Sequence, residues 1–141
     1  MTIRPARSEA DLAACFPVMQ ALRPHLSGPA EFIERALRQF EQGYHLLAAW
    51  SADTVVGAAG YRMGENLIRG RFCYVDDLVV ADDHRRHGLG AKLLDAVAAE
   101  ARSEGIGRLT LDTALDNVLG QRFYFRYGML PGSLRFAKVL D

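Results

Sequence analysis

Apolar side chains recur along the chain with two different periods, and the change of period separates expected helices from expected strands. Up to Gly43 they recur every three or four positions, which predicts one helix after Ser8 and another after Gly28. The Ser8 hydroxyl can cap the first helix, and Pro29 suits the first turn of the second. A short strand is expected before both helices, near Ile3.

Between residues 44 and 80 the pattern is typical of strands. It predicts three strands, at residues 44–50, 54–63 and 71–80. The third strand is rich in apolar and β-branched residues. Strands that have neighbours on both sides usually have this composition, so we expect it at the centre of the sheet. Alternation along this strand places four side chains on one face, namely Tyr74, Asp76, Leu78 and Val80.

The last part of the chain alternates helices and strands. Apolar residues every four positions from Leu89 predict a helix over residues 89–103, which Gly105 can cap. A strand, a helix and a final strand are then expected, at residues 108–112, 117–127 and 134–139. The order β-α-α-β-β-β-α-β-α-β predicts an α/β (α+β) fold, with a mixed sheet and helices on its faces.

Length and composition indicate one domain over residues 1–141. Half of the residues are hydrophobic, which is enough for a single core. Cys15 and Cys73 lie in apolar runs, where a small core side chain is the usual role. The four histidines show no ligand spacing, so no metal site is expected.

Charge and targeting signals narrow the class of protein. Basic and acidic residues both number 17, so the formal net charge is zero. Proteins that mainly bind nucleic acid usually carry a basic excess, so we expect no such partner. The N-terminus lacks the pattern of a signal peptide, and no apolar run approaches the ~20 residues of a membrane span. These features predict a cytoplasmic protein with no membrane partner.

A basic segment with two glycines stands between the third long strand and the helix at residues 89–103, and it reads Arg85-Arg86-His87-Gly88-Leu89-Gly90-Ala91. The start of a helix offers unpaired N–H groups and a partial positive charge, and glycines let a pyrophosphate come close. The two arginines add charge that does not titrate away. A solvated basic turn has a similar composition, but the flanking strand and helix favour a phosphate site. The P-loop and Rossmann patterns are absent.

The segment from Arg85 to Gly90 resembles the acetyl-CoA pyrophosphate motif of the GNAT N-acetyltransferase superfamily. That motif consists of Gln or Arg, two residues, Gly, one residue, and Gly or Ala. The run from Asn117 to Tyr124, followed by Gly128, is similar to the family's Asn-x-x-Ala-x-x-Phe-Tyr-x-x-x-Gly-Phe signature. Three departures remove no group that the chemistry needs: Asp82 for Pro, Gly120 for Ala and Met129 for Phe.

The resemblance implies a mixed, mostly antiparallel sheet of six to seven strands flanked by about four helices. It implies acetyl-CoA as a cosubstrate and no metal. The pantetheine would bond to a splayed strand and to Asn117, which is also a favourable helix N-cap. The implied cofactor-binding residues are Leu78, Val79, Val80, Arg85, Arg86, His87, Gly88, Leu89, Gly90, Ala91, Asn117 and Phe123.

Tyr124 is the candidate general acid. The resemblance places this tyrosine near the CoA sulfur, and a phenol can donate a proton at neutral pH. The aromatic run at residues 123–127 would by itself indicate core packing. Its spacing from Asn117 and Gly128 favours the catalytic role.

Asp76 is the candidate general base, acting through a water. With a lysine-like pKa of about 10.4, neutralising the acceptor amine at pH 7 costs roughly 4–5 kcal/mol. Some relatives carry a carboxylate at this place, and a carboxylate in an apolar strand is costly to bury. The sequence leaves a structural role equally open, in which Asp76 or Asp77 pairs with Arg62 or Arg71.

These features predict an N-acetyltransferase that passes an acetyl group to a primary amine of a small molecule or peptide by direct attack in a ternary complex. Two alternatives stay open. One is a catalytically silent CoA-binding sensor or subunit on the same fold, and the other is a neutral interaction domain. The acceptor is expected beside the first two helices and the final strand, whose residues name no single amine. Relatives often form homodimers, which makes a homodimer a further option.

Overall fold

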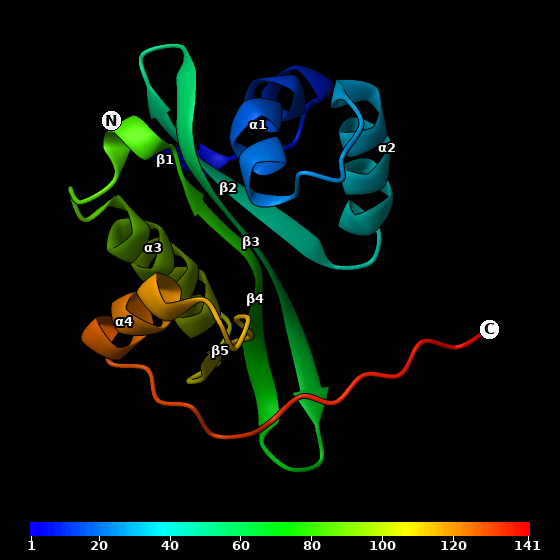
Figure 1. Ribbon diagram of the computed structural model, residues 1–141, viewed down its shortest axis with the longest axis vertical. Helices are drawn as coiled ribbons and strands as arrows, with labels where there is room; N and C mark the ends of the chain where they lie inside the picture. The colour runs from blue at the N-terminus through cyan, green and yellow to red at the C-terminus, as the bar shows by residue number, and fades with distance from the viewer.

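The computed structural model describes residues Met1–Asp141 and contains five strands and four α-helices (Figure 1). The elements are β1 (Thr2–Pro5), α1 (Glu9–Leu22), α2 (Pro29–Phe40), β2 (Tyr44–Ser51), β3 (Thr54–Asn66), β4 (Gly70–Val80), a 3-10 turn (Asp82–His84), α3 (Leu89–Ser103), β5 (Leu109–Leu111) and α4 (Val118–Tyr127). The sheet order is β1-β2-β3-β4-β5, with β5 parallel to β4 and the other pairs antiparallel. Among the helices, none combines the length and apolar character that a membrane crossing requires.

The sheet separates two hydrophobic cores. Figure 1 shows α1 and α2 on one side of the sheet and α3 and α4 on the other. Leu12 and Phe32 pack in the core under α1 and α2, and Leu93 packs in the core under α3. Cys15 and Cys73 are free and buried, one in each core, which confirms the expectation of two core cysteines.

The helices begin and end at the signals in the sequence. Ser8 Oγ accepts a hydrogen bond from the Asp11 N–H (3.1 Å) at the start of α1, and Pro29 opens α2. Gly105 and Gly128, just beyond α3 and α4, have φ values of +74° and +98°, which glycine adopts without strain. The four predicted helices and the first five predicted strands are confirmed.

The strand predicted at residues 134–139 does not form, so the prediction of six to seven strands was wrong and the sheet has five. Residues 130–141 make no backbone hydrogen bond, and Figure 1 shows this tail leaving α4 as an irregular segment whose C-terminal end projects from the body. A strand needs a neighbour that pairs its backbone. An alternating pattern therefore shows that a segment is able to form a strand. It does not show whether another strand is available to pair with that segment.

Strand β4 contains a β-bulge at Asp76, and the bulge changes the facing of the residues beyond it. Gly60 lies opposite Asp77 and Tyr61 lies opposite Val75, so Asp76 has no partner in β3. The extra residue shifts the alternation of side chains by one position from there to the end of the strand.

The facing predicted for β4 was wrong as a result. Val75 packs in the core under α3, so Asp76 faces α1 and α2. Val79 also packs on the α1 and α2 side, whereas Leu78 and Val80 pack on the α3 side. Strict alternation of side chains assumes that each residue of a strand lies opposite one residue of the neighbouring strand. A bulge adds a residue that has no such partner, so the alternation shifts by one position. The four residues divide between the faces, with Tyr74 and Asp76 on one and Leu78 and Val80 on the other.

A polar cluster on the α1 side holds the bulge in place. Asp77 accepts hydrogen bonds from the Tyr44 hydroxyl (2.6 Å) and from Arg23 Nε (3.1 Å). Gly60 lies directly beneath these groups, because a Cβ there would stand 2.7 Å from Asp77 Oδ2 and would also collide with the Tyr44 hydroxyl. Glycine is therefore required at this position by close approach of the side chains.

Gly60→Ala is expected to lower the free energy of unfolding by about 1–3 kcal/mol, because the added methyl overpacks the contact between Tyr44 and Asp77. Chemical denaturation measures the change. Gly107→Ala is the matched control, since nothing lies within 4 Å of a Cβ at that position. Equal stabilities of the two variants would contradict the close approach at Gly60.

Candidate active site

A cavity of about 230 Å³ lies where β4 and β5 separate. The two strands pair over three residues that end at Val75 and Leu111, and beyond them β4 has no neighbour on this side. Side chains from the end of α1, from β4, from the connection after β5 and from α4 line the cavity. Both candidate catalytic residues, Asp76 and Tyr124, are among them.

Tyr124 reaches this cavity from α4. Its ring packs edge-to-face against Phe123, with ring centroids 5.3 Å apart. Burial raises the pKa of the Tyr124 phenol above its ordinary value, so the group is protonated at neutral pH. Its hydroxyl has no hydrogen-bond partner in the chain. Tyr124 thus combines aromatic packing with a free proton donor at the cavity.

Asp76 reaches the cavity from the bulge of β4. Its carboxylate accepts a hydrogen bond from Arg62 Nε (2.9 Å), and Arg62 Nη2 also donates to Gln39 of α2 (2.9 Å). Partial burial raises the pKa of Asp76, and the Arg62 guanidinium opposes that rise. The structure therefore contains the ion pair between Asp76 and Arg62 that a structural role predicts. It also leaves the Asp76 carboxylate on the cavity wall, as a catalytic role requires.

The neighbouring Asp77 has a different environment. Arg23 Nη2, at the end of α1, donates to Asp77 Oδ1 (2.9 Å) and to the backbone carbonyl of Asp76 (2.7 Å). Arg71, the other arginine considered as a partner, lies 3.7 Å from Glu104 instead. Asp77 fastens α1 to the bulge and does not line the cavity.

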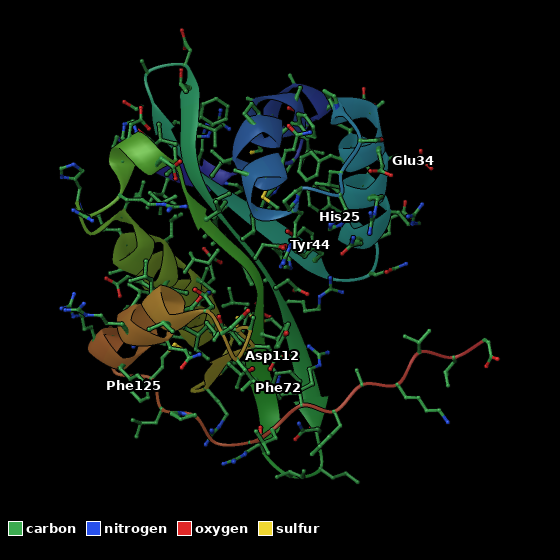
Figure 2. All side chains as sticks on the ribbon, in the orientation of Figure 1. His25, Glu34, Tyr44, Phe72, Asp112 and Phe125 are labelled. Atoms are coloured by element: carbon green, nitrogen blue, oxygen red, sulfur yellow. The ribbon has the colours of Figure 1, made fainter.

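A second carboxylate on the cavity wall, Asp112, was missed in the sequence analysis (Figure 2). It follows β5, accepts a hydrogen bond from the Tyr74 hydroxyl (2.8 Å), and pairs with Arg135 of the C-terminal tail. A polar residue at the carboxyl end of a strand in a parallel pair is a signal for a ligand site. The signal was hidden because the sequence does not show that β5 runs parallel to β4.

The segment predicted to bind phosphate opens α3. Gly88 has φ +76°, and no atom lies within 4 Å of the position a Cβ would take. No side chain caps α3, and its first hydrogen bond runs from the Lys92 N–H to the Gly88 carbonyl (3.1 Å). The N–H groups of residues 89–91 are therefore free to bind an anion.

The basic side chains of this segment differ in their contacts. Arg85 donates to the Val80 carbonyl (3.3 Å) and pairs with Asp82 (3.1 Å), which holds it beside the end of β4. Arg86 has a left-handed backbone with φ +70°, a conformation that residues other than glycine rarely adopt. Arg86 and His87 are both exposed. Their side chains are accessible to an anion in solution.

The next three predicted residues pack against the core or against α4. Leu89 is buried under α3, and Ala91 is partly buried. A Cβ on Gly90 would lie 3.2 Å from the Phe123 ring. The absence of a side chain at Gly90 thus lets Phe123 hold α4 against the first turn of α3.

Asn117 performs the helix-capping role and also lines the cavity. Its Oδ1 accepts a hydrogen bond from the Gly120 N–H (3.1 Å), and its Nδ2 donates to Thr113 Oγ1 (2.9 Å). A Cβ at Gly120 would stand 2.8 Å from Asn117 Cγ, which accounts for glycine where the resembling family often has alanine. The two hydrogen bonds fix the orientation of this amide.

The segment Leu78, Val79 and Val80 continues β4 past the cavity. It pairs with β3 on one side and has no partner on the β5 side. An extended ligand can add to such a free strand edge through backbone hydrogen bonds. No group of three or more His, Cys, Asp or Glu side chains is arranged to hold a metal ion.

Comparisons with known proteins show the family and the fold that the chain shares. The model of the acetyltransferase (GNAT) family matches residues 11–129. The uncharacterized N-acetyltransferase YhdJ of Bacillus subtilis (strain 168) is 28% identical over 122 residues, which are 83% of this chain and 82% of that protein.

Solved structures share the fold at low sequence identity. Aminoglycoside N-acetyltransferase AAC(6')-Iy in complex with CoA has a TM-score of 0.85 at 15% identity, over 98% of this chain and 93% of the other. The ribosomal-protein-alanine N-acetyltransferase of Brucella melitensis biovar Abortus 2308 has a TM-score of 0.85 at 18% identity, over 99% and 100%.

Proposed function

The chain belongs to the acetyltransferase (GNAT) family, and we propose that it transfers an acetyl group from acetyl-CoA to a primary amine of a small molecule or peptide. We propose direct attack in a ternary complex. The observation that carries the proposal is the cavity between β4 and β5, which holds the carboxylate of Asp76 and the free phenol of Tyr124. Strand β4 leads from this cavity to the anion site at the start of α3.

Three features of the chain fit acetyl-CoA. The free N–H groups of residues 89–91, with Arg85 and Arg86 beside them, suit a diphosphate. The unpaired edge of β4 at residues 78–80 suits the amides of the pantetheine. The oriented amide of Asn117 stands on the wall of the cavity that would receive the acetyl group.

The acceptor amine must lose a proton before its nitrogen can attack. We assign this proton to Asp76, through a water, because it is a carboxylate on the cavity wall. Burial raises the pKa of Asp76, which makes its ionised form a stronger base than an exposed aspartate. The nitrogen then bonds to the thioester carbonyl carbon as the carbon–sulfur bond breaks, and the new amide loses its second proton to solvent.

The sulfur leaves with the electron pair of the broken bond and needs a proton. We assign Tyr124 as the donor, because its hydroxyl is protonated, has no competing partner and stands at the same cavity. Tyr124 regains its proton from solvent after the product leaves. Each of the two side chains thus serves one proton transfer.

The acceptor class follows from the cavity and from the relatives. Charged side chains, namely Asp76, Asp112 and Arg23, stand on the cavity wall and suit a polar acceptor. The solved relatives are named for aminoglycosides and for the alanine of a ribosomal protein. These names support a small-molecule or peptide amine as the acceptor of this chain.

A screen for thiol release tests the function. The protein is mixed with acetyl-CoA and with polyamines, amino acids, aminoglycosides or peptides with free N-termini, and the free thiol is followed with time. Amine-dependent release with at least one acceptor class is expected. Binding of acetyl-CoA without release across the whole panel would support the catalytically silent sensor instead.

Acetyl-CoA is expected to raise the Tm of the protein, and Gly88→Leu should abolish that rise. The leucine side chain would occupy open space at the start of α3, next to the residues whose N–H groups are free. Gly105→Leu is the matched control, because Gly105 lies at the other end of α3 with φ +74° and the same open surroundings. A Gly88→Leu protein that keeps the full shift would place the phosphates elsewhere.

A further inference from the structure

The carboxylate of Asp76 is held by an arginine that lies outside the cavity. Arg62 Nε donates to Asp76 Oδ2 (2.9 Å), and Arg62 is not among the residues that line the cavity. The other oxygen, Asp76 Oδ1, accepts no hydrogen bond from the chain. The protein thus fixes one oxygen of this carboxylate and leaves the other available to a water or a substrate.

Two further neighbours fix the guanidinium of Arg62. Its Nη2 donates to Gln39 of α2 (2.9 Å), and its Cζ lies 5.3 Å from the centre of the Tyr44 ring, within the range of a cation–π contact. The Tyr44 ring is buried and stacks on Phe40 of α2, with ring centroids 6.0 Å apart. A planar guanidinium with several donors engaged keeps a fixed direction. Arg62 therefore joins α2 to the bulge of β4 in a defined geometry.

The strand register brings Arg62 to this position. Arg62 lies opposite Tyr44 in β2 and opposite Tyr74 in β4, and side chains at paired positions share one face of the sheet. Asp76 comes two residues after Tyr74 and faces the same side. The bulge leaves Asp76 without a paired residue in β3, so the diagonal contact from Arg62 supplies the restraint that a paired side chain would give.

We propose that Arg62 is a positioning residue for acetyl transfer, which directs the free oxygen of Asp76 into the cavity and supplies the positive charge that keeps this carboxylate ionised. The proposal rests on the proposed function, in which Asp76 accepts the proton of the acceptor amine. Arg62 acts through Asp76 and touches no reacting atom. The ion pair and the catalytic role of Asp76 are then two parts of one arrangement.

The charged groups around Asp76 come from several elements. Burial and the neighbouring Asp77 raise the pKa of Asp76, whereas Arg62 from β3 and Arg23 from α1 lower it. Arg23 is already paired with Asp77. Asp112, on the cavity wall, is paired with the tail. The other titratable neighbours are a thiol and phenols whose own pKa values are raised, so that they are neutral at pH 7, namely Tyr44, Cys73, Tyr74 and Tyr124.

Titration of Asp76 gives the first test and needs no substrate. NMR of protein with ¹³C-labelled aspartate carboxyl groups follows the titration, and Asp76→Asn identifies the signal. Arg62→Gln should move the midpoint upward by about one pH unit, because loss of the nearby cation favours the neutral acid. Arg62→Lys restores a cation and should restore most of the shift. An unchanged midpoint in a folded Arg62→Gln protein would overturn the proposal.

The pH dependence of thiol release gives the second test. In Arg62→Gln the loss of activity on acidification should begin about one pH unit higher than in the parent protein. Its kcat at neutral pH should fall about 10- to 100-fold, because the carboxylate is less well oriented. Arg62→Lys should recover the acidic side of the profile and only part of kcat, since an ammonium group cannot span Asp76 and Gln39 as a guanidinium does. Full kcat in both variants would overturn the positioning role.

Arg71→Gln is the matched control. Arg71 lies on β4, contacts Glu104 and does not line the cavity, so its loss should change neither the midpoint nor the pH profile. An equal shift in this control would overturn the assignment to Arg62. A parent protein that releases no thiol with any amine would overturn the proposed function and the role of Arg62 with it. An unchanged Asp76 titration in an active Arg62→Gln protein would overturn the role of Arg62 alone.

Discussion

Tyr124→Phe should lower kcat by about 100- to 10,000-fold, the usual contribution of a general acid, with little change in the Kd of acetyl-CoA. The substitution keeps the ring and its packing against Phe123 and removes only the hydroxyl. That hydroxyl has no partner in the chain, so its loss leaves no group of the protein unpaired. Binding should persist because the N–H groups of α3 and the edge of β4 are unchanged. Turnover and a direct binding constant together measure the effect.

Tyr127→Phe is the matched control on the same helix. The Tyr127 hydroxyl donates to Asp95 of α3 (2.7 Å) and lies outside the cavity, so kcat should stay close to that of the parent protein. If Tyr124→Phe weakens acetyl-CoA binding and leaves the rate of the bound complex normal, Tyr124 positions the cosubstrate. A fall in kcat well below 100-fold would mean that the thiolate takes its proton from water.

Asp76→Asn should lower the rate by a similar factor, about 100- to 10,000-fold, and most strongly at low pH. In the parent protein the base works above the pKa of Asp76, and burial raises that pKa, so activity is lost on acidification earlier than with an exposed aspartate. In the variant only the fraction of amine that is already neutral reacts. That fraction falls about tenfold per pH unit below the amine pKa. The ratio of the two rates should therefore shrink as the pH approaches the amine pKa.

The rate of each protein across a pH series, with acetyl-CoA saturating, measures this difference. Asparagine can still accept the hydrogen bond from Arg62, so the ion-pair partner keeps its place. Asp112→Asn is the control, because it removes the other carboxylate of the cavity and should retain the pH profile of the parent. If the Asp112 variant shows the altered pH dependence and the Asp76 variant does not, Asp112 is the base.

Local signals in the sequence predicted the helices and most of the sheet well. Caps such as Ser8 and Asn117 satisfy helix ends through their own side chains, and apolar periodicity marks the buried face of each helix. The glycines of the basic segment likewise placed the open start of α3 correctly. These features depend on residues that lie close together in the sequence. The local sequence pattern is therefore sufficient to predict them.

The features that the sequence did not predict depend on distant partners. The bulge at Asp76 is held by Tyr44 and Arg23, which lie far away along the chain. The place of Asp112 on the cavity wall follows from the parallel pairing of β5 with β4. The tail has strand-like alternation, but its backbone pairs with no other strand, so the alternation alone did not decide its structure.

The bulge in β4 also limits which changes of chain length the protein can tolerate during evolution. Surface loops tolerate the loss of a residue, because no strand pairing or core packing depends on the number of residues in the loop. Loss of Asp76 would restore a regular ladder and turn the end of β4 over, so that Val79 would exchange cores with Leu78 and Val80. A deletion of one residue would thus repack both sides of the sheet at once. Substitution is therefore the only gradual route by which this end of the strand can change.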